Sequence, residues 1–122
     1  MSTQWAFFKD HDQLKKLAVD EIFLLEVTDN YVKIFLAPGG TVMVRSTLDA
    51  LLRLLPDKQF VRLSRTYAAG VEYIEYITKD TLRILGLDHE IPVTKHYYEK
   101  LREKLIILGE YQGGEKEQKN DQ

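Results

Sequence analysis

The sequence has no cysteine among its 122 residues, which excludes disulfide bonds, thiolate metal sites and cysteine nucleophiles. It also has no long hydrophobic run. The longest, such as Ile22 to Leu25 and Ile106 to Leu108, fall far short of the roughly 20 residues that a membrane-spanning helix needs. The start of the chain lacks the basic and apolar segments of a secretory signal. We therefore expect a cytoplasmic protein with no membrane partner.

Motifs that carry catalysis or bind metals are also missing. The histidines His11, His89 and His96 lack the paired spacing of metal ligands, and Asp88-His89-Glu90 is predicted to form a polar turn. No potential nucleophile has the flanking residues of a catalytic motif. These absences predict a protein that is not an enzyme and that needs no metal, cofactor or small-molecule ligand.

The residues that are present give an ordinary globular composition with segregated charge. Hydrophobic residues make up 44 % of the chain and the formal net charge is -2, which suits one domain with its own core. Residues 31–67 carry six basic and two acidic side chains, and residues 93–109 carry four basic and two acidic ones. These two segments form a cationic face if the fold collects them on one side. Otherwise they are ordinary solvated charges.

Short apolar runs bounded by turn residues predict a mainly β domain. Between two of these runs, Ala37-Pro38-Gly39-Gly40 predicts a type II turn with Gly39 at the third position. A phosphate-binding loop is not expected there, because no Gly-Lys-Ser/Thr sequence follows. The expected strands cover residues 5–8, 22–27, 31–36, 41–44, 60–63, 73–77, 81–85 and 91–93.

Two segments have helical periodicity. The first follows a capping box from Ser46 to Asp49 and stops at Pro56. The second is capped by Thr94, has Leu101 and Leu108 on one apolar face, and ends at Gly109. We therefore predict one domain over residues 1–109, and we expect residues 110–122 to be a disordered polar tail.

Several motifs follow one another along the chain in a particular order. They are Asp29-Asn30-Tyr31-Val32-Lys33-Ile34, Val44-Arg45-Ser46-Thr47-Leu48, Leu54-Leu55-Pro56, Phe60-Val61-Arg62-Leu63-Ser64-Arg65-Thr66-Tyr67 and Ile91-Pro92-Val93-Thr94-Lys95. With an opening hairpin between Phe7 and Ile22, this order resembles the LytTR DNA-binding domain over residues 5–108. Family members usually sit behind a receiver domain, for which this chain has no room.

The resemblance implies an elongated, mainly β fold of small antiparallel sheets with two short helices. It also implies that inter-strand loops and the entry to the last helix bind duplex DNA. Ser64 and Gly70 stand where the family commonly has His and Asn, and Thr94-Lys95-His96 stands where Ser-Arg-Arg is more usual. These departures lie near the expected DNA surface, so they bear on the target sequence more than on the fold.

Three residues are the first candidates for DNA contacts. Arg65 occupies the family position that projects toward DNA, and its planar fork matches the acceptors of guanine; a salt bridge to Glu72 or Glu75 is the structural alternative. Lys95 begins a helix, where a cation is favourable if a phosphate docks there; it is otherwise an ordinary exposed lysine. Asn30 lies in a loop that family members insert into a groove, where its amide can read adenine. Its alternative role is that of a left-handed turn residue.

Further candidates for phosphate contact lie next to these positions in the motifs. Arg62 is not among them, because it precedes Arg65 by three residues in a run expected to be extended, which would point the two side chains to opposite faces. The further candidates are Tyr31, Lys33, Arg45 and His96.

We therefore expect a transcriptional regulator that binds double-stranded DNA sequence-specifically, with two copies pairing on repeated half-sites. The first alternative is a protein-interaction module of the same fold that modulates a partner regulator without binding DNA, which the negative net charge permits. A small β-barrel that binds a ligand is the second. The fold alone does not decide among them, because function resides in sites.

Overall fold

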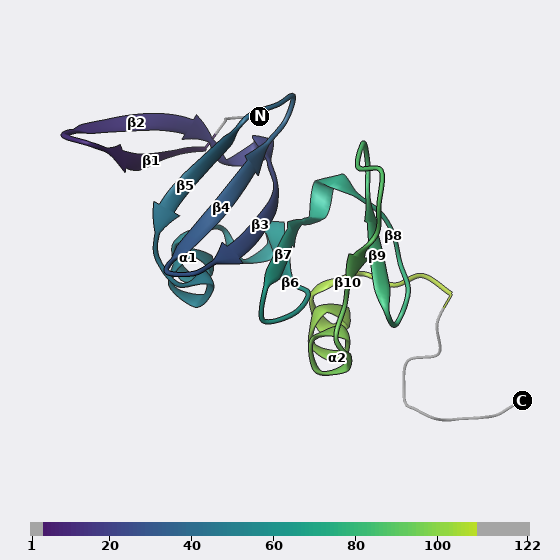
Figure 1. Ribbon diagram of the computed structural model, residues 1–122. Helices are drawn as coiled ribbons and strands as arrows, with labels where there is room; N and C mark the ends of the chain where they lie inside the picture. The colour runs from purple at the N-terminus through teal and green to yellow at the C-terminus, as the bar shows by residue number, and fades with distance from the viewer. Residues whose placement is uncertain (1–3, 110–122) are drawn as a thin grey trace, which may run out of the picture.

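The computed structural model describes residues 4–109 (Figure 1). Residues 1–3 and the tail expected at residues 110–122 lie outside the described residues. The strands are β1 (Trp5–Asp10), β2 (Gln13–Ala18), β3 (Ile22–Thr28), β4 (Tyr31–Leu36), β5 (Thr41–Arg45), β6 (Phe60–Arg62), β7 (Tyr67–Gly70), β8 (Ile74–Ile77), β9 (Thr81–Ile84) and β10 (Ile91–Pro92). The helices are α1 (Leu48–Leu54) and α2 (Lys95–Lys104), with short 3-10 turns η1 (Val19–Glu21), η2 (Asp57–Gln59) and η3 (Val71–Tyr73).

A five-stranded antiparallel sheet in the order β5-β4-β3-β7-β6 forms the centre of the domain. Residues paired across neighbouring strands share a face of a sheet. The register places Leu25 beside Ile34 and Leu24 beside Phe35, and successive residues of β3 point to opposite faces. Leu25 is 0 % exposed and Leu24 is 4 % exposed. Strand β3, in the middle of this sheet, is therefore buried on both faces.

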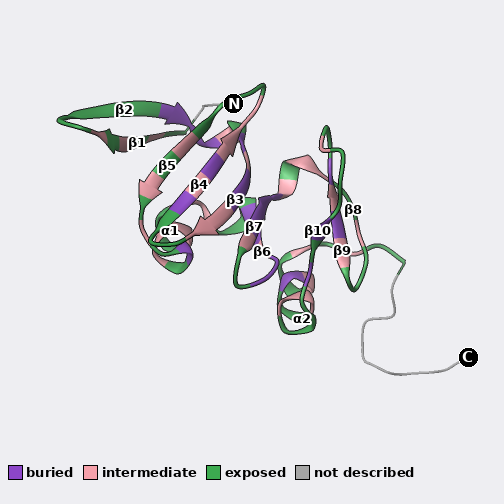
Figure 2. Cartoon of the chain, in the orientation of Figure 1, coloured by how far each residue is buried: buried purple, intermediate pink, exposed green. Residues whose placement is uncertain are grey.

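Two separate cores cover these faces. The first includes Leu48 of α1 and Leu17 of the β1–β2 hairpin. The second includes Leu82 and Ile84 of the three-stranded sheet β10-β9-β8, and Leu101 of α2. Figure 2 shows buried segments along β4 and β9, whereas most of the hairpin is exposed. Each helix thus covers its own face of the central sheet.

The arrangement is elongated, with the hairpin projecting at one end and the three-stranded sheet at the other (Figure 1). Every strand pair in the described part of the chain is antiparallel. The predicted fold class, a mainly β domain of small antiparallel sheets with two short helices, is confirmed.

Two predicted helix boundaries are wrong. The N-cap of α1 is Thr47 rather than Ser46, because the Thr47 hydroxyl accepts a hydrogen bond from the Ala50 N–H at 3.1 Å. Helix α2 ends at Lys104, five residues before the expected end at Gly109. Leu108 was expected on the apolar face of this helix, but it is 88 % exposed and lies outside the helix.

The turn between β4 and β5 also differs from the prediction. The Ala37–Pro38 peptide bond is cis, and the positive φ of 100° belongs to Gly40 rather than to Gly39. The turn is therefore not a type II turn with Gly39 at its third position.

Gly70 ends β7 at a point where no side chain fits. An ideal Cβ there would lie 2.4 Å from the carbonyl oxygen of Ile22. We expect Gly70→Ala to lower the free energy of unfolding by about 1–3 kcal/mol, because the backbone of β3 would have to shift. Denaturant unfolding measures this loss. Gly39→Ala is the matched control, since nothing lies within 4 Å of its Cβ, and equal stability of the two variants would disprove the close approach.

Candidate functional site

Segments that are far apart in the sequence surround one shallow hollow of about 680 Å³. They are the β3–β4 turn, the junction between β5 and α1, the end of β6 with the β6–β7 turn, and the first turn of α2. Three predicted DNA contacts, Asn30, Arg45 and Arg65, line this hollow together with Arg62 and Tyr97. The fold therefore brings three arginines to one place on the surface.

The β3–β4 turn presents Asn30. Thr28 pairs with Tyr31, so that Asp29 and Asn30 form a two-residue turn. Asp29 has φ 56°, and it is therefore Asp29 that takes the left-handed conformation considered above for Asn30. Asn30 is exposed, and its amide makes no hydrogen bond to other residues within 4–109.

The junction between β5 and α1 presents Arg45. Arg45 is the last residue of β5 and is exposed. The chain enters α1 only three residues later, because the Thr47 hydroxyl satisfies one of the free N–H groups at the start of the helix. The Ser46 hydroxyl donates to the Thr47 carbonyl at 2.9 Å. This sharp change from strand to helix holds Arg45 at the rim of the hollow.

The β6–β7 turn presents Arg65. The buried hydroxyl of Ser64 accepts hydrogen bonds from the N–H groups of Thr66 and Tyr67, both at 3.1 Å. Arg65 lies inside this turn and is exposed. Ser64, which departs from the usual family residue, therefore has a structural role in fixing the turn.

The alternative ion pair considered for Arg65 is absent. Within residues 4–109 no carboxylate lies within ion-pair distance of Arg65, and Glu75 instead lies 3.9 Å from Arg83.

The hydroxyl of Tyr67, in the strand that follows Arg65, donates a hydrogen bond to the carboxylate of Glu26 at 3.3 Å. Burial, and then the negative charge of Glu26, raise the pKa of Tyr67 above its ordinary value, so the phenol stays a neutral donor.

The prediction that Arg62 points away from Arg65 is wrong, because both residues line the hollow. Strand β6 ends at Arg62, and the N–H groups of Leu63 and Ser64 bond to the Tyr67 carbonyl at 2.9 and 3.3 Å. The chain therefore turns before Arg65, and the strand alternation assumed for the prediction does not extend that far. No signal in the sequence marked the end of this strand.

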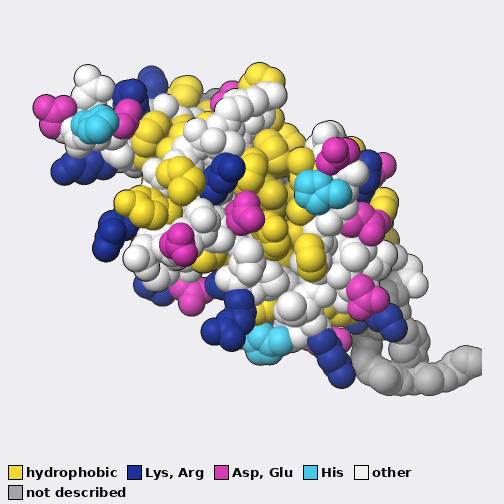
Figure 3. Space-filling view, in the orientation of Figure 1, with side chains coloured by type: hydrophobic (Ala, Val, Ile, Leu, Met, Phe, Trp, Pro, Cys, Tyr) yellow, Lys and Arg dark blue, Asp and Glu magenta, His cyan; other side chains and the backbone are white. Residues whose placement is uncertain are grey.

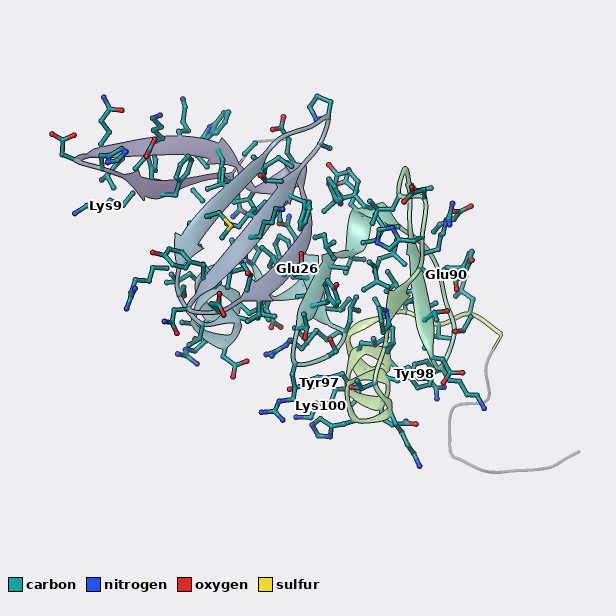
Figure 4. All side chains as sticks on the ribbon, viewed as in Figure 1. Lys9, Glu26, Glu90, Tyr97, Tyr98 and Lys100 are labelled. Carbon is teal, nitrogen blue, oxygen red and sulfur yellow. The ribbon has the colours of Figure 1, made fainter. Side chains whose placement is uncertain are left out.

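Arg62 connects several of the segments around the hollow. Its side chain is 17 % exposed, and its guanidinium group binds the carboxylate of Asp49 in α1 at 2.5 Å. The same group lies 5.1 Å from the ring centre of Tyr97 in α2. Figure 4 shows Tyr97 and Lys100 on one side of α2, and both line a neighbouring hollow together with Asp49 and Arg62.

Lys95 and His96 are the first two residues of α2, and both are exposed. The preceding Thr94 makes no side-chain bond to the helix, while its carbonyl accepts from the Tyr98 N–H at 2.8 Å. The His96 ring meets the Tyr97 ring edge-on at 4.9 Å. Lys95 and His96 do not line the hollow, but they adjoin Tyr97, which does.

Tyr31 and Lys33 lie on β4 outside the hollow. Tyr31 is 39 % exposed and pairs with Arg45 across β4 and β5. Lys33 pairs with Met43, and its Nζ lies 5.2 Å from the ring centre of Phe35. Tyr31 is thus the direct neighbour of a hollow residue, whereas Lys33 lies farther along the sheet.

The hollow carries a net positive charge, because three arginines and two aspartates line it. Asp29 and Asp49 also line it, but Asp49 is paired with Arg62. Arg45 and Arg65 remain exposed. Figure 3 shows several Lys and Arg side chains, with a histidine among them, along the lower edge of the domain near α1 and α2. An anionic ligand is therefore favoured at this edge.

Comparison with known proteins identifies the family of this domain. Residues 12–106 match the LytTr DNA-binding domain family. A solved LytTr DNA-binding domain, from a Bacillus cereus protein described as a methyl-accepting/DNA response regulator, has a TM-score of 0.69 and 21 % identity, covering 82 % of this chain and 94 % of that chain. An uncharacterized response regulatory protein of Vibrio cholerae is 27 % identical over 79 residues, which is 62 % of this chain and 30 % of that protein. This chain therefore matches less than a third of the length of the Vibrio relative.

The chain belongs to the LytTR DNA-binding domain family, since the match covers most of its length. This family is non-enzymatic, and the chain is accordingly not an enzyme. Within residues 4–109, no helix is long and apolar enough to cross a membrane.

Proposed function

We propose that this domain binds double-stranded DNA sequence-specifically in the cytoplasm and regulates transcription. The shared hollow supports this proposal most, because Asn30, Arg45 and Arg65 reach it from three separate segments. Reading bases requires planar side chains with paired hydrogen-bonding groups. Stable docking also requires cationic side chains nearby that contact the DNA phosphates. The hollow and its rim supply both kinds of group.

Two residues are proposed to contact bases. Arg65 is exposed in a turn that Ser64 holds in one conformation, so its guanidinium fork can approach a guanine without reordering of the backbone. Within residues 4–109 the side-chain amide of Asn30 has no hydrogen-bond partner, and Asp29 takes the left-handed position of the turn. Its amide is suited to paired hydrogen bonds with adenine.

The remaining candidates are proposed to contact phosphates. Arg45 borders the hollow directly, and Tyr31 lies beside it in the sheet. Lys95 and His96 are exposed at the start of α2, where the free N–H groups of the helix also favour an anion. Lys33 has the least support, because its ammonium group lies over Phe35.

Replacing Arg65 and replacing Lys95 should affect DNA binding in different ways. We expect Arg65→Ala to cost about 1–3 kcal/mol on the preferred duplex and to reduce discrimination at one base pair, because a paired base contact is lost. We expect Lys95→Ala to weaken binding to all duplexes by a similar factor and to reduce the salt slope by about one unit. Fluorescence anisotropy over a salt series measures both effects, with the preferred duplex selected from a random library.

Thermal unfolding is the control for both variants, because replacing an exposed side chain changes stability by less than about 0.5 kcal/mol. If Arg65→Ala unfolded the protein, Arg65 would be a structural residue instead. If library selection enriched no motif, the proposal of sequence-specific binding would be wrong.

We also propose that two copies pair on repeated half-sites. One domain of this size offers few phosphate contacts, and joining two sites multiplies their affinities. The domain should therefore bind a duplex with two half-sites more tightly than a duplex with one, at equal length. Titration of both duplexes under one salt condition measures the ratio. Equal affinities would remove the pairing from the proposal.

A protein-interaction role is the second candidate, and the β1–β2 hairpin favours it. Trp5 is 54 %, Phe7 61 % and Leu14 72 % exposed. Alternation along the hairpin places all three on the face opposite Phe8 and Leu17, which pack on the first core. The same face also carries Lys9 and Lys16. Binding through its apolar side chains would respond little to salt, whereas DNA binding weakens steeply as salt rises.

A further inference from the structure

The guanidinium group of Arg62 is held by three different parts of the protein. Its Nε donates to the carbonyl oxygen of Ser64 at 2.6 Å, and its Nη2 donates to the carbonyl oxygen of Arg65 at 3.0 Å. Its Nη1 binds Asp49 at 2.5 Å, and the whole group lies over Tyr97 at 5.1 Å. One planar group therefore ties the β6–β7 turn to both α1 and α2.

These contacts direct Arg62 toward the protein rather than toward a ligand. Each of its three nitrogens already donates to a protein oxygen, and the side chain is only 17 % exposed. Arg65 is exposed, and its own carbonyl is one of the acceptors. Arg62 therefore acts on the backbone that carries Arg65.

We infer that Arg62 is a positioning residue, which orients the β6–β7 turn relative to α1 and α2 and so sets how well Arg65 discriminates between base pairs. The inference rests on the DNA binding proposed above. A paired contact to guanine requires one orientation of the guanidinium group. A turn that samples several orientations loses base discrimination, while the attraction of its charges to phosphates remains.

Lysine cannot replace Arg62 in this role, because its single nitrogen cannot reproduce the planar fork. Arg62→Lys keeps the charge but cannot bind the Ser64 carbonyl, the Arg65 carbonyl and Asp49 in the same geometry. We expect it to reduce about tenfold the ratio between affinities for the preferred duplex and for a duplex with one substituted base pair. The affinity for a random-sequence duplex should change by less than about twofold, because the phosphate contacts are unchanged.

The free protein gives a second readout that does not depend on DNA. The N–H groups of Thr66 and Tyr67 bond to the Ser64 hydroxyl within the turn. Arg62→Lys should accelerate hydrogen exchange of these two amides and leave the amides of β3 unchanged, since local opening of a turn does not require opening of the core.

Two further variants complete the design. Arg53→Lys is the matched control, because Arg53 is exposed on α1 and does not line the hollow; it should leave base discrimination and amide exchange unchanged. Asp49→Asn keeps the shape of the carboxylate but removes its charge, and should shift both readouts in the same direction as Arg62→Lys, by less. This variant tests the inference even if Arg62→Lys does not fold.

Several results would overturn the inference. A salt slope reduced by about one unit in Arg62→Gln would make Arg62 a phosphate contact. Equal losses of affinity for preferred and random duplexes in Arg62→Lys, with faster exchange in β3, would make it a merely structural residue. Unchanged exchange at Thr66 and Tyr67 would show that Arg62 does not hold the turn.

The two readouts also separate this inference from the proposed function. A wild-type protein without sequence preference would refute the proposed readout, and with it the discrimination assigned to Arg62. If Arg62→Lys still accelerated exchange of the Thr66 and Tyr67 amides, the contacts of Arg62 with the turn would stand, and only the proposed DNA readout would be wrong.

Discussion

Strand β3 is buried on both faces, and the rest of the domain is arranged around that constraint. Because Leu24 and Leu25 enter opposite cores, one face must be covered by α1 and the hairpin, and the other by α2 and the three-stranded sheet. The first turns of both helices then lie at the same hollow, beside the β3–β4 and β6–β7 turns. The candidate site thus results from the way in which the two cores are covered.

Net charge is a poor guide to this domain, because function depends on where the charges lie. The chain has a formal net charge of -2, yet its hollow is lined by three arginines. One of them, Arg62, is paired with Asp49 inside the structure. Arg45 and Arg65 remain exposed. An acidic protein can therefore keep a cationic site, since screening by salt limits the influence of distant carboxylates to roughly 10 Å.

The sequence predicted most of the fold, because most strands carry apolar runs and the motifs of the family lie in register. It did not predict β7, whose small residues Ala68 and Ala69 give no apolar run but fit tightly against β3. It also extended α2 too far, because the leucine spacing continues beyond the last helical turn. The family motifs also pointed to Asn30, Arg45 and Arg65 as candidate site residues, and these three residues line one hollow in the structure. Arg62 was left out because the strand-like sequence does not reveal the turn that brings Arg62 and Arg65 to the same hollow.

The most direct test of the central claim is to map a random-sequence duplex onto the domain by amide chemical shifts at low salt, where phosphate contacts dominate binding. The account predicts that the largest shifts fall in residues 29–30, 45–47, 64–66 and 94–97, around the hollow and its rim. The β1–β2 hairpin and the β8–β9 turn should shift little. Shifts concentrated in the hairpin, or no shifts at all, would contradict the account.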